Sequence, residues 1–187
     1  MRKWLLVLLI IVLGVRIGFL IIKKNRPQPD SIIKKIRKME KVEVPLRVTI
    51  HSYPTYPDPK LTPGDIVNYP IEKICVSGYS DEERHVTNSR KKEVYAEYGV
   101  PYPQPKGSYE VDHFMPVCIG GSNEMSNLWL QPAQPYPGYH EKDQLEQYLC
   151  RAVCRDGKMT IQEAQNLFRT DWYKAYQQYI EIRNESR

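Results

Sequence analysis

The chain has 187 residues, of which 41% are hydrophobic and 26% charged, a composition typical of one globular domain with a modest core. Its net charge of +5 is unevenly spread. Residues 1–41 carry eleven Lys and Arg against two acidic residues, or +9, which leaves −4 for residues 42–187. The composition therefore gives no support for a C-terminal domain that binds nucleic-acid phosphates through a broad positive surface.

Residues 1–22 are typical of a membrane or targeting segment. Arg2 and Lys3 precede an apolar run from Trp4 to Ile22 that Arg16 interrupts once. As a helix this run is about 28 Å long, close to the ~30 Å hydrocarbon core of a bilayer. No small-residue cleavage site follows it, so we predict an uncleaved single-pass anchor. A cleaved signal peptide and a buried or interfacial helix are the alternatives.

Two patterns disagree about the side of the membrane. Most Lys and Arg near the apolar run follow it, and the positive-inside rule then places the C-terminal domain in the cytoplasm. An even number of cysteines instead favours an exported domain. These cysteines are Cys75, Cys118, Cys150 and Cys154. We expect the domain outside the cytoplasm, with the cytoplasmic side as the alternative and secretion if the segment is cleaved.

After the apolar run, residues 23–57 are predicted to be a basic linker with one strand at Val42–Ile50, and residues 58–183 the domain. The domain opens with a proline-rich loop, and Lys73–Val76 predicts a short strand. Thr87–Tyr98 predicts a helix that stops at Gly99.

Alternation then predicts two strands, at Tyr109–Pro116 and Asn127–Gln131, on either side of a glycine-rich turn. An apolar stripe predicts a helix over His140–Cys154. The capping box Thr160-x-x-Glu163 opens a last helix. Trp129 and Trp172 are expected in the core.

Polar residues stand at the joints of this strand, turn, strand and helix. Glu110, Asp112 and His113 lie on the first strand, Asn127 at the start of the second and His140 at the helix start. When a carboxylate and a histidine are neighbours, each side chain can take a different role in catalysis. The carboxylate is a hard ligand for a divalent cation, and an unligated histidine can take a proton from water near neutral pH.

This segment resembles the HNH endonuclease family of the ββα-metal nuclease superfamily. The matching residues are Asp112-His113, Gly120-Gly121, Asn127-Leu128-Trp129 and His140. One bacterial subgroup is resembled more closely, through the segments Leu61–Gly64 (LTPG), Cys75–Tyr79 (CVSGY) and Lys142–Glu146 (KDQLE). The resemblance covers about residues 58–180.

The resemblance implies an α+β fold with a ββα-metal core and additional helices. It implies a metal-dependent endonuclease that hydrolyses DNA, or alternatively RNA, with little sequence preference. By position, His113 resembles the general base and Glu110 a residue that orients it. Asn127 resembles the residue that braces the loop, and Asp112 and His140 resemble the metal ligands.

The resemblance also bears on the ion, the substrate contacts and the disulfides. Many zinc-binding members have a further histidine one turn after His140, where this chain has Gln144. That departure favours Mg²⁺, with Mn²⁺, Ni²⁺ or Zn²⁺ as alternatives. Arg84 and Lys142 are candidates for phosphate contact. If the domain is exported, a Cys75–Cys154 disulfide is expected, and Cys118–Cys150 is a second candidate pair.

A second class of function competes with the enzyme. The −4 charge of residues 42–187 favours a membrane-tethered, non-catalytic binding or structural protein on a degenerate HNH fold. The expected partners are a nucleic acid and, through the N-terminal helix, a membrane; the sequence points to no protein partner.

Overall fold

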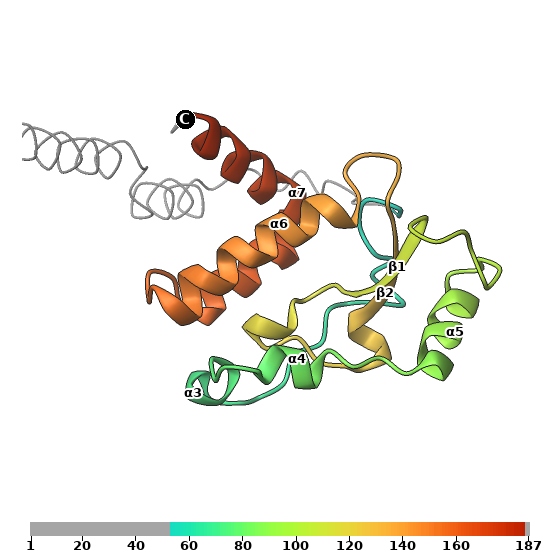
Figure 1. Ribbon diagram of the computed structural model, residues 1–187, viewed down its shortest axis with the longest axis horizontal. Helices are drawn as coiled ribbons and strands as arrows, with labels where there is room; N and C mark the ends of the chain where they lie inside the picture. The colour runs from blue at the N-terminus through green and yellow to red at the C-terminus, as the bar shows by residue number, and fades with distance from the viewer. Residues whose placement is uncertain (1–52, 186–187) are drawn as a thin grey trace, which may run out of the picture.

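The computed structural model describes residues 53–185 (Figure 1). The predicted anchor at residues 1–22 and the predicted strand Val42–Ile50 lie outside these residues. Between residues 53 and 185, none of the helices combines the length and the apolar character that a membrane crossing requires.

The described residues combine helices with one small sheet. In chain order the elements are α3 (Ile71–Ile74), α4 (Tyr79–Glu83), α5 (Asn88–Glu97), β1 (Tyr109–His113), the 3₁₀ turns η1 (Val117–Ile119) and η2 (Met125–Asn127), β2 (Leu128–Pro132), α6 (Tyr139–Cys150), the π-helical turn η3 (Arg151–Arg155) and α7 (Ile161–Glu185).

The sheet is an antiparallel pair in which His113 lies opposite Leu128 and Tyr109 opposite Pro132. Every residue of β2 is buried, whereas β1 is buried only at His113. β1 ends at His113 and not at Pro116 as predicted, because the Met115 main chain bonds to the Asn127 side chain in place of a strand partner.

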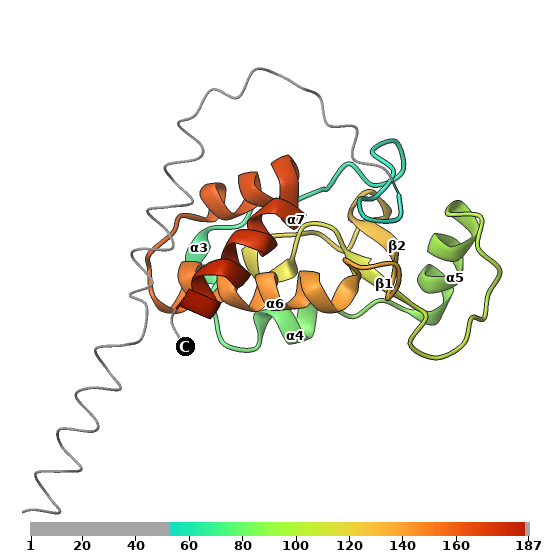
Figure 2. The same ribbon diagram turned by 90° about the horizontal axis from the view of Figure 1, so that it is seen from above.

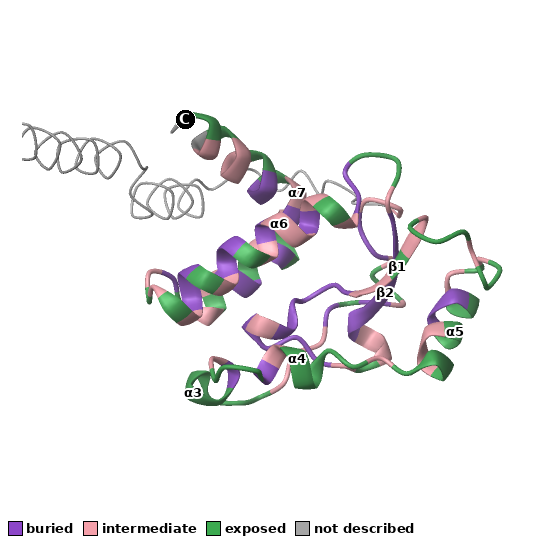
Figure 3. Cartoon of the chain, in the orientation of Figure 1, coloured by how far each residue is buried: buried purple, intermediate pink, exposed green. Residues whose placement is uncertain are grey.

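Helices cover both sides of this pair. Figure 1 shows α6 and α7 on one side of the strands and α5 on the other, with α3 and α4 below α6, and Figure 2 shows α5 at one end of the molecule. The main core lies between α6, α7 and the strands, where Trp129, Trp172, Leu145 and Phe168 are fully buried. Figure 3 shows the buried faces turned toward one another.

Two local predictions agree with the structure. α5 begins after Thr87, whose side chain accepts a hydrogen bond from the Arg90 N–H at 3.2 Å, and ends before Gly99. The capping box before α7 is formed, since Glu163 N–H donates to Thr160 Oγ1 and Thr160 N–H donates to Glu163. Both signals are local, so they are legible without the fold.

The predicted strand at Lys73–Val76 is wrong. Helix α3 occupies Ile71–Ile74, with Pro70 as its N-cap and Ile74 as its buried residue. An apolar run this short does not distinguish a strand from a helical turn. The proline, whose fixed φ suits a helix start, decides for the helix.

The four cysteines form two disulfides, Cys75–Cys154 and Cys118–Cys150, with Cα–Cα distances of 5.1 and 5.7 Å. The predicted Cys75–Cys154 pair is thereby confirmed. One bridge joins η3 to Cys75, just after α3, and the other joins the C-terminal end of α6 to Cys118 in η1.

Candidate active site

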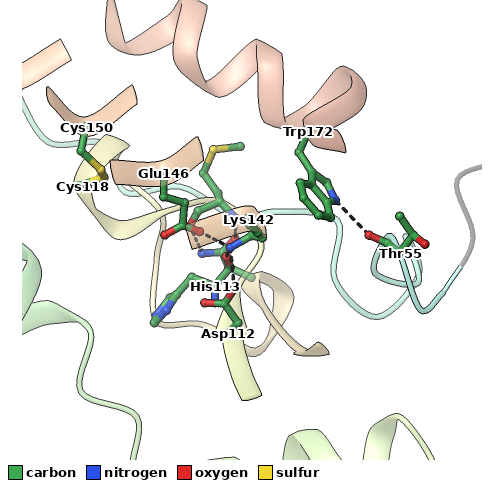
Figure 4. A network of polar contacts seen from close by, with 10 residues as sticks. Thr55, Asp112, His113, Cys118, Lys142, Glu146, Cys150 and Trp172 are labelled. Atoms are coloured by element: carbon green, nitrogen blue, oxygen red, sulfur yellow. Dashed lines mark hydrogen bonds and ion pairs between the residues drawn. A yellow bond between two sulfur atoms is a disulfide. The ribbon is translucent and has the colours of Figure 1, made fainter. Parts of the chain in front are cut away.

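A pocket of about 930 Å³ opens where the end of β1 faces α6 on one side and the α4–α5 connection on the other. Asp112 and His113 line it from β1, Asp143 and Glu146 from α6, and Arg84 from the residues after α4. Figure 4 shows the inner wall of this region, with Lys142 between Asp112 and Glu146 and His113 beside them.

The imidazole of His113 is held by one ring nitrogen. Its Nε2 lies 2.6 Å from Asn123 Oδ1. The Asn123 amide is oriented by its own Nδ2, which donates to the Glu83 carbonyl. Because an amide oxygen only accepts, Nε2 carries the proton and Nδ1 carries the lone pair. No residue in the described range bonds to Nδ1, so this nitrogen is the one available as a base.

Hydrogen bonds of its main-chain groups also fix the position of His113. The His113 N–H donates to Asp112 Oδ1 at 2.8 Å, and the His113 carbonyl accepts from Lys142 Nζ at 2.7 Å. Burial lowers the pKa of His113 below its ordinary value, against an opposing effect of Asn123 and Asp112. A neutral imidazole near pH 7 is the form that a general base requires.

Lys142 is the central cation of the site. Its ammonium donates to Asp112 Oδ2 at 2.6 Å, to the His113 carbonyl and to Glu146 Oε1. Three acceptors match its three N–H donors, and the side chain is 0% exposed. Although burial acts to lower it, Asp112 and Glu146 hold the pKa of Lys142 above its ordinary value.

This burial corrects the phosphate contact predicted for Lys142. The ammonium is enclosed and all of its donors are used, so it does not reach a substrate in the pocket. A sequence signal for this position existed: Lys142 lies three and seven residues before Leu145 and Leu149, on the apolar stripe of α6. A lysine on such a stripe is buried only when it is paired.

The His140 side chain points in a different direction from α6 than the Lys142 side chain does. It stands two residues before Lys142, which is about 200° around the helix. The His140 side chain is exposed, and its ring packs on Tyr139 with centroids 4.2 Å apart. It still lowers the pKa of Glu110 and Asp143, so it lies at the edge of the carboxylate group without lining the pocket.

Carboxylates crowd this edge of the pocket. Burial raises the pKa of Glu110 and of Asp143 above their ordinary values, and the charge of Asp112 raises both further. Burial also raises the pKa of Glu146, against the opposing effect of Lys142. Glu110 lines the pocket two residues before Asp112 on the same strand face.

Asn127 lies behind the pocket, 0% exposed, and every group of its amide is used. Its Oδ1 accepts from Met115 N–H at 2.7 Å, and its Nδ2 donates to the carbonyls of Met115 and Ser122 at 2.9 and 2.8 Å. Gly121 packs against the Met115 main chain and the Asn127 side chain. A Cβ added at Gly121 would lie 1.7 Å from the Met115 oxygen. Asn127 and Gly121 thus hold the turn that carries Asn123.

Arg84 is the exposed cation on the opposite wall. Its side chain is 61% exposed, donates from Nε to the Ser80 carbonyl at 2.9 Å and faces Asp81 at 3.6 Å. It lowers the pKa of both His113 and Asp143, which places its charge within electrostatic reach of both. A guanidinium in this position is suited to a phosphate.

The predicted metal site at Asp112 and His140 does not fit the arrangement of these residues. Asp112 Oδ2 is bound to the Lys142 ammonium and Oδ1 to the His113 N–H. His140 is exposed outside the pocket lining. Within residues 53–185, no group of three or more His, Cys, Asp or Glu side chains is arranged to hold a metal ion.

Sequence reasoning missed two residues of this site. The sequence gives no role to Asn123, whose side chain bonds to the His113 ring, or to Glu146, whose carboxylate binds the Lys142 ammonium. Comparison of the chain with protein-family models, with curated proteins and with solved structures finds no match.

Proposed function

We propose that the protein hydrolyses phosphodiester bonds in nucleic acid, DNA first and RNA as the alternative, with His113 as the general base. The observation that carries the proposal is the state of the His113 ring. Its Nε2–H is anchored on Asn123, and its Nδ1 lone pair is left without a partner among the described residues in a solvent-accessible pocket.

In the proposed reaction, Nδ1 takes a proton from a water molecule and the water oxygen attacks phosphorus. The bond from phosphorus to the leaving oxygen breaks, and that oxygen takes a proton from solvent. Arg84 would contact a nonbridging phosphate oxygen and offset the charge that develops there. No step of the proposal passes through a metal ion.

A non-catalytic binding protein is the second candidate, and the carboxylates at the pocket edge favour it. Glu110, Asp143 and Glu146 surround the place where a polyanion would enter, which weakens binding of nucleic acid. This candidate predicts that the pocket binds a cationic or neutral partner and cleaves neither DNA nor RNA.

The two disulfides also support a proposed location outside the cytoplasm, because such bridges persist in oxidising compartments. An anchor at residues 1–22 would then hold the domain at the outer face of the membrane. Labelling of a single introduced cysteine with a membrane-impermeant thiol reagent in intact cells tests this topology.

The test of the activity is cleavage of quenched fluorescent DNA and RNA oligonucleotides by the full chain in detergent. His113→Ala is expected to lower kcat/KM by about 10²–10⁴, the usual loss for one general base, in a chain that still folds. Added imidazole is expected to restore part of the rate to this variant alone. Undiminished cleavage by His113→Ala would rule out the proposed base, and no cleavage by the wild type would favour the binding protein.

A further inference from the structure

The Asp112 carboxylate was expected to hold a divalent ion, and the structure has a lysine ammonium there. Lys142 Nζ lies 2.6 Å from Asp112 Oδ2, a distance typical of a charge-assisted hydrogen bond. Of the Lys, Arg, Asp and Glu side chains whose burial is described, Lys142 is the one that is buried.

The surroundings of this ammonium are those of a built cation site. Its acceptors are the carboxylates of Asp112 and Glu146 and the main-chain carbonyl of His113, all oxygens. The face of Phe168 lies 5.7 Å from Nζ and adds a further favourable contact for a cation. The carbonyl belongs to the proposed base itself, so the ammonium is tied to the residue whose position matters most.

A divalent ion on the same carboxylate would be opposed by this arrangement. An ion bound to either Asp112 oxygen would lie within about 5 Å of Nζ, where two positive charges repel strongly in a buried site. Displacing the ammonium would leave a charged lysine buried without acceptors, which is strongly unfavourable. The predicted second ligand, His140, offers no compensation because it lies on another face of α6.

We propose that Lys142 is a built-in cation that replaces a divalent metal ion at Asp112, and that it acts as a positioning residue for His113. The catalytic half of this statement rests on the proposed function, and the cation half does not. Hydrolysis is then independent of divalent ions, and the Asp112–Glu146 pair becomes a metal site only when the ammonium is removed.

The experiment measures Mn²⁺ binding by isothermal titration with the full chain in detergent, independently of any activity. We expect the wild type to have no Mn²⁺ site at Asp112, so the Asp112→Asn variant should bind as much Mn²⁺ as the wild type. Lys142→Met removes the ammonium and leaves two facing carboxylates, so it is expected to gain one Mn²⁺ that the Lys142→Met/Asp112→Asn double variant loses. Lys174→Met, at an exposed lysine of α7, is the matched control and should gain none.

Activity supplies the second readout. Wild-type cleavage is expected to be unchanged by a chelator, whereas cleavage by Lys142→Met falls at least tenfold and is partly restored by Mn²⁺. A structural role alone would lower the rate without creating this metal dependence. If cleavage is absent but the Mn²⁺ results are as expected, the proposed function fails and the cation assignment stands.

Two outcomes overturn the inference. One is a wild-type Mn²⁺ site that Asp112→Asn removes, which is measurable whether or not Lys142→Met folds. The other is a folded Lys142→Met chain that gains no Mn²⁺.

Discussion

At the scale of single residues, the proposed chemistry depends on one tautomer. Asn123 Oδ1 accepts from His113 Nε2, so the lone pair is on Nδ1. Burial keeps this imidazole neutral by lowering its pKa, and the charge of Arg84 lowers that pKa further. This shift favours the neutral, basic form of His113.

This gives a pH prediction. A neutral His113 is required, so kcat/KM is expected to rise with pH through the pKa of His113 and to level off above it. The midpoint should lie below about 6.5, the ordinary histidine value. Arg84→Gln removes a charge that lowers this pKa, so the midpoint should move up, while Arg169→Gln on the exposed face of α7 should leave it in place. A midpoint above 6.5 in the wild type would contradict the burial of the base.

The same shift affects stability. Between the folded pKa of His113 and about pH 6.5, the unfolded chain binds more protons than the folded chain. The free energy of unfolding is therefore expected to decrease as the pH falls through this range.

At the scale of elements, the site is made by the junction of a hairpin and a helix. The first turn of α6 sends Lys142 to the end of β1, while η2 and β2 place Asn127 under the turn after β1. The buried side-chain amide of Asn127 therefore supports the main chain of the turn that holds Asn123.

Asn127→Ala is expected to destabilise the protein by about 3 kcal/mol, because it leaves the N–H and carbonyl of Met115 and the carbonyl of Ser122 buried without a partner. Asn166→Ala, at an exposed position on α7, should change the free energy of unfolding by less than about 0.5 kcal/mol. Urea denaturation of both variants measures the difference. A similar small effect at both positions would mean that the turn is held by other contacts.

At the scale of the whole molecule, two disulfides join the layers that form the pocket walls. Cys118 and Cys150 themselves line the pocket, whereas Cys75 and Cys154 lie outside its lining. The bridges span 79 and 32 residues of sequence. Loop entropy then assigns about 4.5 kcal/mol to Cys75–Cys154 and about 3.7 kcal/mol to Cys118–Cys150.

We expect Cys75→Ser/Cys154→Ser to lose more stability than Cys118→Ser/Cys150→Ser, by less than about 1 kcal/mol. Activity is expected to follow the opposite order, because only the second bridge borders the pocket. Guanidinium denaturation and oligonucleotide cleavage of both double variants measure the two quantities. The same order in both measurements would show that the pocket responds to stability alone.

The local elements were largely legible from the sequence. The capping box at Thr160 and Glu163, the helix closed by Gly99 and the strand pair around the glycine-rich turn each follow from neighbouring residues. The pairing of Cys75 with Cys154 was also anticipated, through the family resemblance. The short helix α3 was missed because four residues carry too little periodicity to separate a helical turn from a strand.

What the sequence by itself determined was that Asp112 and His113 lie on a strand and that a later helix carries both His140 and Lys142. Only the tertiary structure decided which of these two reaches Asp112. They stand two residues apart and so point in different directions from α6, and the packing of Leu145 and Leu149 into the core turns the Lys142 face inward. A local pattern records which side chains are near one another in sequence, but the rotation of a helix about its axis is set by the core against which it packs.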